Sequence, residues 1–215
     1  MKKALKWMFI VLGCVIGVIG FFVIAFIVGM TPDKDEEAKV TAKAEEYLKA
    51  EYSDQMEIYD TLYDNMGNFG FEYAAKAANY YNHVSFLVYE DSETGKMVDD
   101  YAVSYFEEEL QEAIVDDVEK RFRNAGMIVA DYKQTAAARK YLGETDLPEI
   151  KDLDVAPTLS IWMDRGKEDG DKQKMKEIID ILKKDIHLPQ VKVMIHYYAA
   201  SGDGTISMAY GTKEE

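Results

Sequence analysis

The hydrophobic and polar positions divide the chain into one long apolar run and a following region of changing periodicity. From Trp7 to Met30 no residue is charged. As a helix, these 24 residues would extend about 36 Å, against a bilayer hydrocarbon core of about 30 Å. We therefore predict that residues 1–30 form a cytoplasmic stub and a transmembrane anchor, with residues 7–30 in contact with membrane lipid.

Two other interpretations of this run involve processing. The sequence VLGC, which ends at the only cysteine, Cys14, is similar to a lipoprotein cleavage box, but 16 further residues continue the apolar run instead of turning polar. A cleavable signal peptide would have an apolar stretch of about 7 to 15 residues and a small-residue exit. The length of the run and its ending, IVGMTPD, favour an uncleaved anchor.

Flanking charge predicts the orientation of this anchor. Lys2, Lys3 and Lys6 precede the run, whereas the segment TPDKDEEAKV after it is mainly acidic. Basic residues favour the cytoplasmic side of a membrane helix. We expect a single-pass protein of the cell membrane, with a cytoplasmic N-terminus and an extracellular C-terminal domain.

Small residues within the run suggest a surface for helix pairing. Gly13, Gly17 and Gly20 fall on one helical face, and this small-residue pattern lets two membrane helices approach closely. The hypothesis that follows is a homodimer formed through the transmembrane helix. The alternative is that glycine is simply common in membrane helices.

Residues 31–133 change from helical to alternating patterning. The segment after the anchor predicts a new helix with Thr31 as its N-cap. In DQMEIYDTLYDN polar and apolar residues alternate, which places Met56, Ile58 and Leu62 on one side of a strand. Further strand candidates and turns follow, and then an amphipathic helix in SYFEEELQEAIVDDVEKRFRNAG. The pattern predicts a first exported lobe made of a helix, an antiparallel meander and a helix.

A second patterned region follows a connector. After the strand candidate MIVADYKQ, residues 134–156 contain Gly, Pro and many acidic residues. Residues 157–215 then show a strand, a clear amphipathic helix and two more strands, a β-α-β-β lobe. The predicted fold class is α+β: one N-terminal transmembrane helix, then two small lobes with antiparallel sheets packed against helices.

Charge excludes one class of partner. Three of the 25 Lys and Arg precede the apolar run, so residues 31–215 carry 22 basic and 40 acidic side chains, a formal charge of −18. Such a surface repels nucleic acid, and we expect no nucleic-acid partner. Fifteen Tyr and nine Phe indicate a folded protein with sheets.

The sequence contains no recognisable catalytic or ligand-binding motif. It has three histidines without metal-ligand spacing, no nucleophile elbow and no phosphate-binding glycine loop. We predict no catalytic, metal-ligating or cofactor-binding residue and no cofactor. Trp162 and Tyr198 are candidates for contact with a ligand or partner, because each is expected on the outward side of a strand; packing within the sheet is the alternative.

The sequences EEYLKAEYSDQMEIY, FEYAAKAANYYNHVSFLVYED and GKMVDDYAVSYFEEELQEAI resemble the first lobe of YfjL-like proteins, membrane-anchored proteins of Gram-positive bacteria. The stretch from PTLSIWMD to VKVMIHYY is similar to their second lobe. The resemblance implies an anchor with a small α+β exported region, but no reaction. A helix leading into a meander is also similar to cystatin-like and PepSY-type modules, which would imply contact with a peptide or protease.

Two functions are compatible with these observations. The first is a membrane-anchored, non-catalytic binding or regulatory module at the cell surface that contacts an envelope protein or a peptide. The alternative is an envelope hydrolase that uses dispersed acidic residues. A deep pocket with two convergent carboxylates, or His196 beside an acid, would favour the enzyme.

Overall fold

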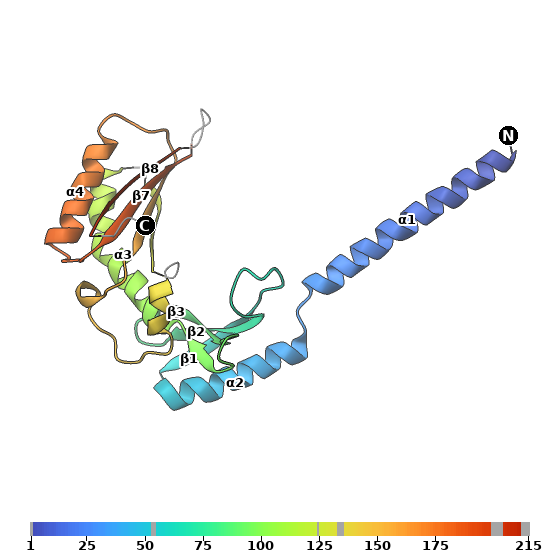
Figure 1. Cartoon of the computed structure of the whole chain (residues 1–215), viewed down its shortest axis with the longest axis horizontal. Helices are drawn as coiled ribbons and strands as arrows, with labels where there is room; N and C mark the ends of the chain where they lie inside the picture. The colour runs from blue at the N-terminus through green and yellow to red at the C-terminus, as the bar shows by residue number, and fades with distance from the viewer. Residues whose placement is uncertain (1, 53–54, 124, 133–135, 199–203, 212–215) are drawn as a thin grey trace.

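The computed structural model describes residues 2–52, 55–123, 125–132, 136–198 and 204–211. It confirms the predicted α+β class: a long N-terminal helix is followed by two sheets packed against helices (Figure 1). The helices are α1 (Lys2–Met30), α2 (Lys34–Tyr52), α3 (Tyr101–Arg121) and α4 (Asp171–Lys184), with short 3-10 helices η1 (Ala136–Tyr141) and η2 (Ile150–Asp152). The strands are β1 (Met56–Tyr63), β2 (Tyr73–Asn79), β3 (Ser85–Glu90), β4 (Met97–Asp99), β5 (Ala125–Asp131), β6 (Thr158–Met163), β7 (Val191–Tyr197) and β8 (Gly204–Tyr210).

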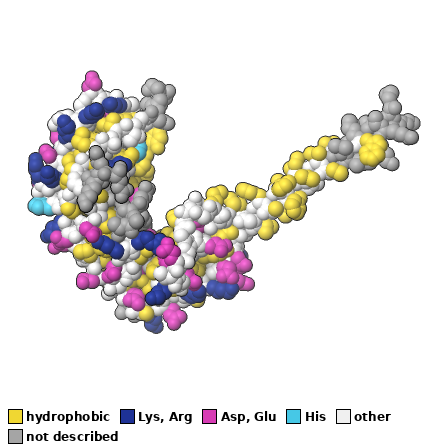
Figure 2. Space-filling view, viewed as in Figure 1, with side chains coloured by type: hydrophobic (Ala, Val, Ile, Leu, Met, Phe, Trp, Pro, Cys, Tyr) yellow, Lys and Arg dark blue, Asp and Glu magenta, His cyan; other side chains and the backbone are white. Residues whose placement is uncertain are grey.

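Helix α1 projects away from the rest of the protein (Figure 1). None of the side chains between Leu12 and Met30 is buried, and the mean hydropathy over its most apolar 18 residues is 2.8. Figure 2 shows a hydrophobic surface along this part of α1 without basic or acidic side chains. By length and composition, α1 can span a membrane.

The junction between α1 and α2 differs from the prediction. Thr31 is not the N-cap of α2, because its hydroxyl donates a hydrogen bond to the Ile27 carbonyl in the last turn of α1 (2.8 Å). Asp33 takes the capping position instead, and its carboxylate accepts a hydrogen bond from the Asp35 N–H (2.8 Å). An ionised carboxylate suits the positive end of a helix better than a hydroxyl does.

The first sheet is the predicted antiparallel meander, in the order β1-β2-β3-β4. Helix α2 covers one face of it (Figure 1). Three alanines in β2, Ala74, Ala75 and Ala77, are fully buried. Alanine favours helices when it is exposed, but here the small side chains of Ala75 and Ala77 let α2 and the sheet pack closely, and burial determines the strand.

Strand β1 contains a β-bulge after Ile58. Met56 and Ile58 pack under α2, as the alternation predicts. Beyond the bulge Thr61 faces α2, where its hydroxyl donates to the Glu37 carboxylate (2.8 Å). The extra residue reverses the alternation, so Leu62 lies on the opposite face and its predicted grouping with Met56 and Ile58 is wrong.

The second sheet has the order β5-β6-β7-β8 and is mixed. Strands β6 and β7 run parallel and are joined by α4, whereas the other neighbouring pairs are antiparallel. The prediction of antiparallel sheets in both lobes therefore needs correction, because a helical crossover returns the chain in the same direction. Strand β5, which the prediction grouped with residues 31–133, also pairs with β6 in this sheet.

Helix α3 packs in both cores. The first core is the buried cluster between the first sheet and α2, and it includes Tyr101 at the start of α3. The second core is the buried cluster of the second sheet and α4, and it includes the buried face of α3 from Ala102 to Val118. In the described part of the predicted connector 134–156, Leu147 touches both cores. The connector also buries three apolar side chains in the second core: Ile150, Leu153 and Val155.

Candidate functional site

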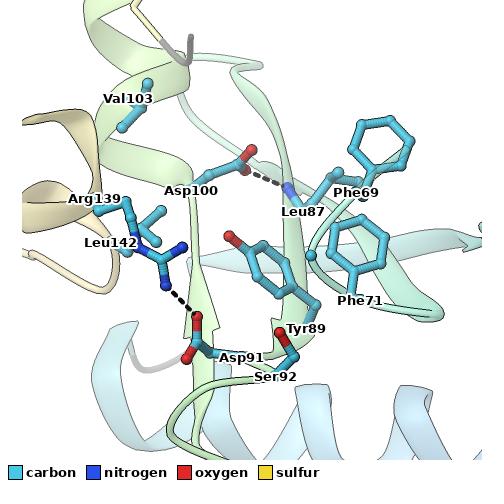
Figure 3. Close-up of a pocket in the computed structure, with 11 residues that line it drawn as sticks. Phe69, Phe71, Leu87, Tyr89, Asp91, Ser92, Asp100, Val103, Arg139 and Leu142 are labelled. Atoms are coloured by element: carbon cyan, nitrogen blue, oxygen red, sulfur yellow. Dashed lines mark hydrogen bonds and ion pairs between the residues drawn. The ribbon is translucent and has the colours of Figure 1, made fainter. Parts of the chain in front are cut away.

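A cavity of about 290 Å³ lies on the first sheet, on the face opposite α2. It is lined by the loop of residues 64–72 between β1 and β2, by β3, by the start of α3 and by η1, and it is open to solvent on one side (Figure 3). This volume is near the lower end of the range for small-molecule sites, so the cavity fits a small group. We refer to it below as the β3 pocket.

Three aromatic rings form one wall of the β3 pocket. The Phe69 and Phe71 rings stack in parallel with centroids 5.2 Å apart, and the Phe71 ring lies 4.5 Å from that of Tyr89. Leu87 and Val103 add aliphatic surface. A ligand with an apolar or aromatic body would bury that body against these side chains.

Tyr89 supplies a polar group inside this apolar wall. Burial, together with the nearby carboxylates of Asp100 and Asp91, raises the pKa of Tyr89 to about 12. The phenol is therefore protonated at neutral pH and able to donate a hydrogen bond. Figure 3 shows its hydroxyl directed toward the space between Asp100 and Arg139.

Asp91 and Arg139 form an ion pair at the edge of the pocket. The Asp91 carboxylate accepts hydrogen bonds from the Thr94 N–H (2.9 Å) and hydroxyl (3.0 Å), and from Arg139 Nη2 (2.9 Å). The Thr94 hydrogen bonds and the Arg139 charge hold the pKa of Asp91 below its usual range. The Arg139 side chain is half exposed and also lies 3.3 Å from the Glu93 carboxylate.

Asp100 joins the start of α3 to β3. Its carboxylate accepts a hydrogen bond from the Leu87 N–H (2.6 Å), and its own N–H donates to the Leu87 carbonyl (3.1 Å). The described residues that line the pocket include two carboxylates and one guanidinium, which together give a net negative charge. A cation near the aromatic wall would be stabilised by both the charge and the ring faces.

The two residues predicted for partner contact lie elsewhere, on the second sheet. The Trp162 indole N–H donates to the Tyr198 hydroxyl (3.2 Å), and the Trp162 ring stacks on His196 with centroids 4.7 Å apart. Tyr198 is 53% exposed. The structure thus brings Trp162 and Tyr198 together on the open face of the sheet, away from the β3 pocket, and their role in contact stays a prediction.

The predicted helix-pairing face is accessible. Nothing lies within 4 Å of the Cβ position of Gly13, Gly17 or Gly20. A second helix has room to approach there, and pairing stays a prediction.

Among the described residues, the side chains considered for a hydrolase each have a hydrogen-bond or stacking partner. Asp91 and Asp100 both line the pocket, but backbone N–H groups hold each carboxylate. His196 contacts Trp162 and the Thr205 hydroxyl (3.3 Å). In the part of the chain that the structure describes, no three His, Cys, Asp or Glu side chains group as a metal site would require.

Sequence reasoning missed the residues of the β3 pocket. Asp91 lies in the sequence DSETGK, which indicates only a turn, and Arg139 is 48 positions further along the chain. Asp100 and Tyr89 lie in segments predicted as strands. The one sequence signal was the aromatic loop NMGNFGF, residues 65–71, which is too apolar for an ordinary exposed turn.

The fold and the pocket define a class: an α+β protein with an N-terminal helix able to span a membrane and a small apolar pocket on its first sheet. No protein-family model matches the chain, and no curated protein matches it. Among solved structures, a DUF5037 family protein from Ruminococcus gnavus ATCC 29149 is similar, with 12% identity and a TM-score of 0.41 over 74% of this chain and 75% of that one. The resemblance to YfjL-like proteins stays a prediction.

Proposed function

We propose that the chain is a single-pass membrane protein with a cytoplasmic N-terminus, and that its extracellular lobes form a non-catalytic binding module. The β3 pocket binds an apolar group with a cationic end, such as a Lys or Arg side chain of a basic peptide segment in an envelope protein. A surface with a formal charge of −18 over residues 31–215 attracts such a segment.

One observation carries this proposal: the β3 pocket combines an aromatic and aliphatic wall with a net negative charge. The aliphatic stem of a basic side chain would lie along Phe71 and Leu87. Its charged end would reach Asp100 and the Tyr89 hydroxyl, whose oxygen accepts a hydrogen bond. A basic side chain has this pairing of apolar body and charge.

Binding can be tested with two small probes that share a ring but differ in charge, phenethylammonium and phenylpropanoate. The full chain in lipid nanodiscs would be titrated with each probe while the methyl NMR signals of Leu87 and Val103 are followed. We expect the cation to bind at least about tenfold more tightly than the anion, because the charged pocket favours the cation by more than 1 kcal/mol. Equal binding, or tighter binding of the anion, would contradict the proposal.

Arg139→Gln provides the sharper test. Removing the guanidinium leaves the Asp91 carboxylate without its cationic partner, so the affinity for phenethylammonium should rise about threefold, the modest value expected of a half-exposed charge. Lys140→Gln is the matched control, because Lys140 is the next residue on η1 but pairs with Asp154 outside the pocket. That control should leave the affinity unchanged.

The orientation of the anchor is tested separately. Protease added to intact cells should remove residues C-terminal to α1, because the three basic residues before α1 favour a cytoplasmic N-terminus. A C-terminal portion that protease cannot reach until the cells are opened would refute the extracellular location of the lobes.

A further inference from the structure

We infer that the loop of residues 64–72, between β1 and β2, contacts the lipid surface of the leaflet from which α1 emerges. This inference rests on the proposed membrane anchor and assigns a second lipid contact to the exported part. The occupant is the interfacial region of the bilayer, the zone of headgroups and first acyl carbons.

Hydrogen bonds place this loop beside the end of α1. The Asn65 side-chain N–H donates to the Gly29 carbonyl (3.2 Å), and the Tyr63 hydroxyl donates to the same carbonyl (3.3 Å). Gly29 and Met30 close the apolar run. If α1 spans the bilayer, the loop therefore lies at the level where the helix leaves the hydrocarbon core. Figure 1 shows the loop reaching toward the junction of α1 and α2.

The loop exposes apolar side chains at this level. Met66 is 68% exposed and Phe69 is 51% exposed. The sequence NMGNFGF has no charged residue. Amphipathic aromatic side chains are enriched at membrane interfaces, and the stacked rings of Tyr63 and Tyr73, 4.8 Å apart, lie beside the same junction.

The loop is held in shape before any lipid contact. The buried Asp64 carboxylate accepts hydrogen bonds from the Phe69 N–H (2.7 Å) and the Met66 N–H (3.1 Å). A loop that is already ordered loses less conformational freedom when it meets the bilayer, which favours contact. Five acidic residues flank the junction, so the contact is expected with neutral lipids through apolar burial: Asp33, Asp35, Glu36, Glu37 and Glu72.

The test uses single-cysteine variants of the full chain with Cys14→Ser, labelled with a polarity-sensitive fluorophore in phosphatidylcholine vesicles. Met66→Cys and Phe69→Cys place the label in the loop. Tyr80→Cys is the matched control: Tyr80 is also exposed and aromatic, but it follows the opposite end of β2, about 20 Å from Tyr73. Ile19→Cys reports the insertion of α1.

Lipids carrying a nitroxide close to the headgroup should reduce the emission of the label at positions 66 and 69 about threefold more than at position 80, as expected for a label at the interface. Lipids with a nitroxide near the chain end should quench the label at position 19 most. Quenching at position 19 with none at 66 and 69 would overturn the loop contact and leave the anchor intact.

Two other outcomes are informative. If the label at position 19 is not quenched, α1 is not inserted and the proposed function fails as well. If the emission at position 69 shifts to the blue without lipid quenching, protein covers the loop, either the β3 pocket or a second copy of the chain, and the lipid contact is refuted.

Discussion

At the residue scale, Asp171 is the clearest buried charge in the second lobe. It is fully buried at the start of α4, and its carboxylate accepts hydrogen bonds from both terminal nitrogens of Arg165 (2.8 and 2.9 Å) and from the Tyr197 hydroxyl (3.0 Å). Burial alone would raise the pKa of Asp171, but these donors and the Glu168 N–H outweigh it and lower the pKa to about 2.

This pKa predicts an acid-sensitive second lobe. An unfolded Asp has a pKa of about 3.9. The pKa of Asp171 is lower in the folded protein, so the unfolded chain binds more protons between the two pKa values. The contribution of Asp171 to the free energy of unfolding is therefore present above pH 4 and is lost as the pH falls toward 2. We expect about 2 kcal/mol of unfolding free energy to disappear in this window. Urea unfolding followed by Trp162 fluorescence, in a Trp7→Phe background, measures it.

Asp171→Asn separates this effect from general acid denaturation. At pH 7 the variant should be about 2 to 3 kcal/mol less stable, because Arg165 loses its charged partner. The difference from the parent should shrink as the pH approaches 2. Asp180→Asn is the control, since Asp180 forms an exposed pair with Lys184 and should change stability little at any pH. A constant difference across the pH range would contradict the assignment.

Contacts between individual side chains were the part of the structure that the sequence predicted least well. Asp171 is visible in the sequence as an acid at a helix start, but its partner Tyr197 lies 26 positions away. The Asp91–Arg139 pair at the β3 pocket is joined across 48 positions. Local patterns contain no information on such separations, because the contacts arise only after distant elements pack.

At the element scale, hydrophobic periodicity predicted the approximate positions of the long helices and of the strands, including β2 with its helix-favouring alanines. The segment GKMVDDYAV, expected to be a strand, contains β4, but its last three residues, Tyr101–Val103, begin α3 instead. Two further errors came from strand pairing. A single bulge in β1 reversed the face of Leu62, and β5 pairs with β6 across a connector that separates them in sequence. Alternation determines which residues share a face, whereas register and partner strand depend on long-range geometry.

Helix α3 provides an element-scale prediction. Leu110 is fully buried on the face that α3 presents to the second core. Leu110→Ala should reduce the unfolding free energy by about 2 to 5 kcal/mol, because it removes buried methyl groups and leaves a cavity. Glu112→Ala, two positions along on the exposed side, should change it by less than about 0.5 kcal/mol. Similar small losses in both variants would show that this face of α3 is not a packed core.

At the scale of the whole molecule, α3 and the connector link the two lobes physically. Leu147 and Tyr105 each touch both cores. The Tyr105 ring lies 6.3 Å from Tyr101, which packs in the first core, and 6.3 Å from Phe106, which packs in the second. Because one helix contributes to both cores, local loss of either core removes support from the other, and we expect the lobes to unfold together.

Tyr105→Ala should weaken this coupling. Truncation removes the ring that contacts both cores, so the lobes should unfold at different urea concentrations. Trp162 fluorescence reports the second lobe, and hydrogen exchange of the β2 amides at Ala75 and Ala77 reports the first. In the parent chain the two probes should give one midpoint, whereas in Tyr105→Ala they should give two. Tyr105→Phe keeps the ring and should retain a single transition. Two separate midpoints in the parent chain would mean that the lobes are independent and that α3 does not couple them.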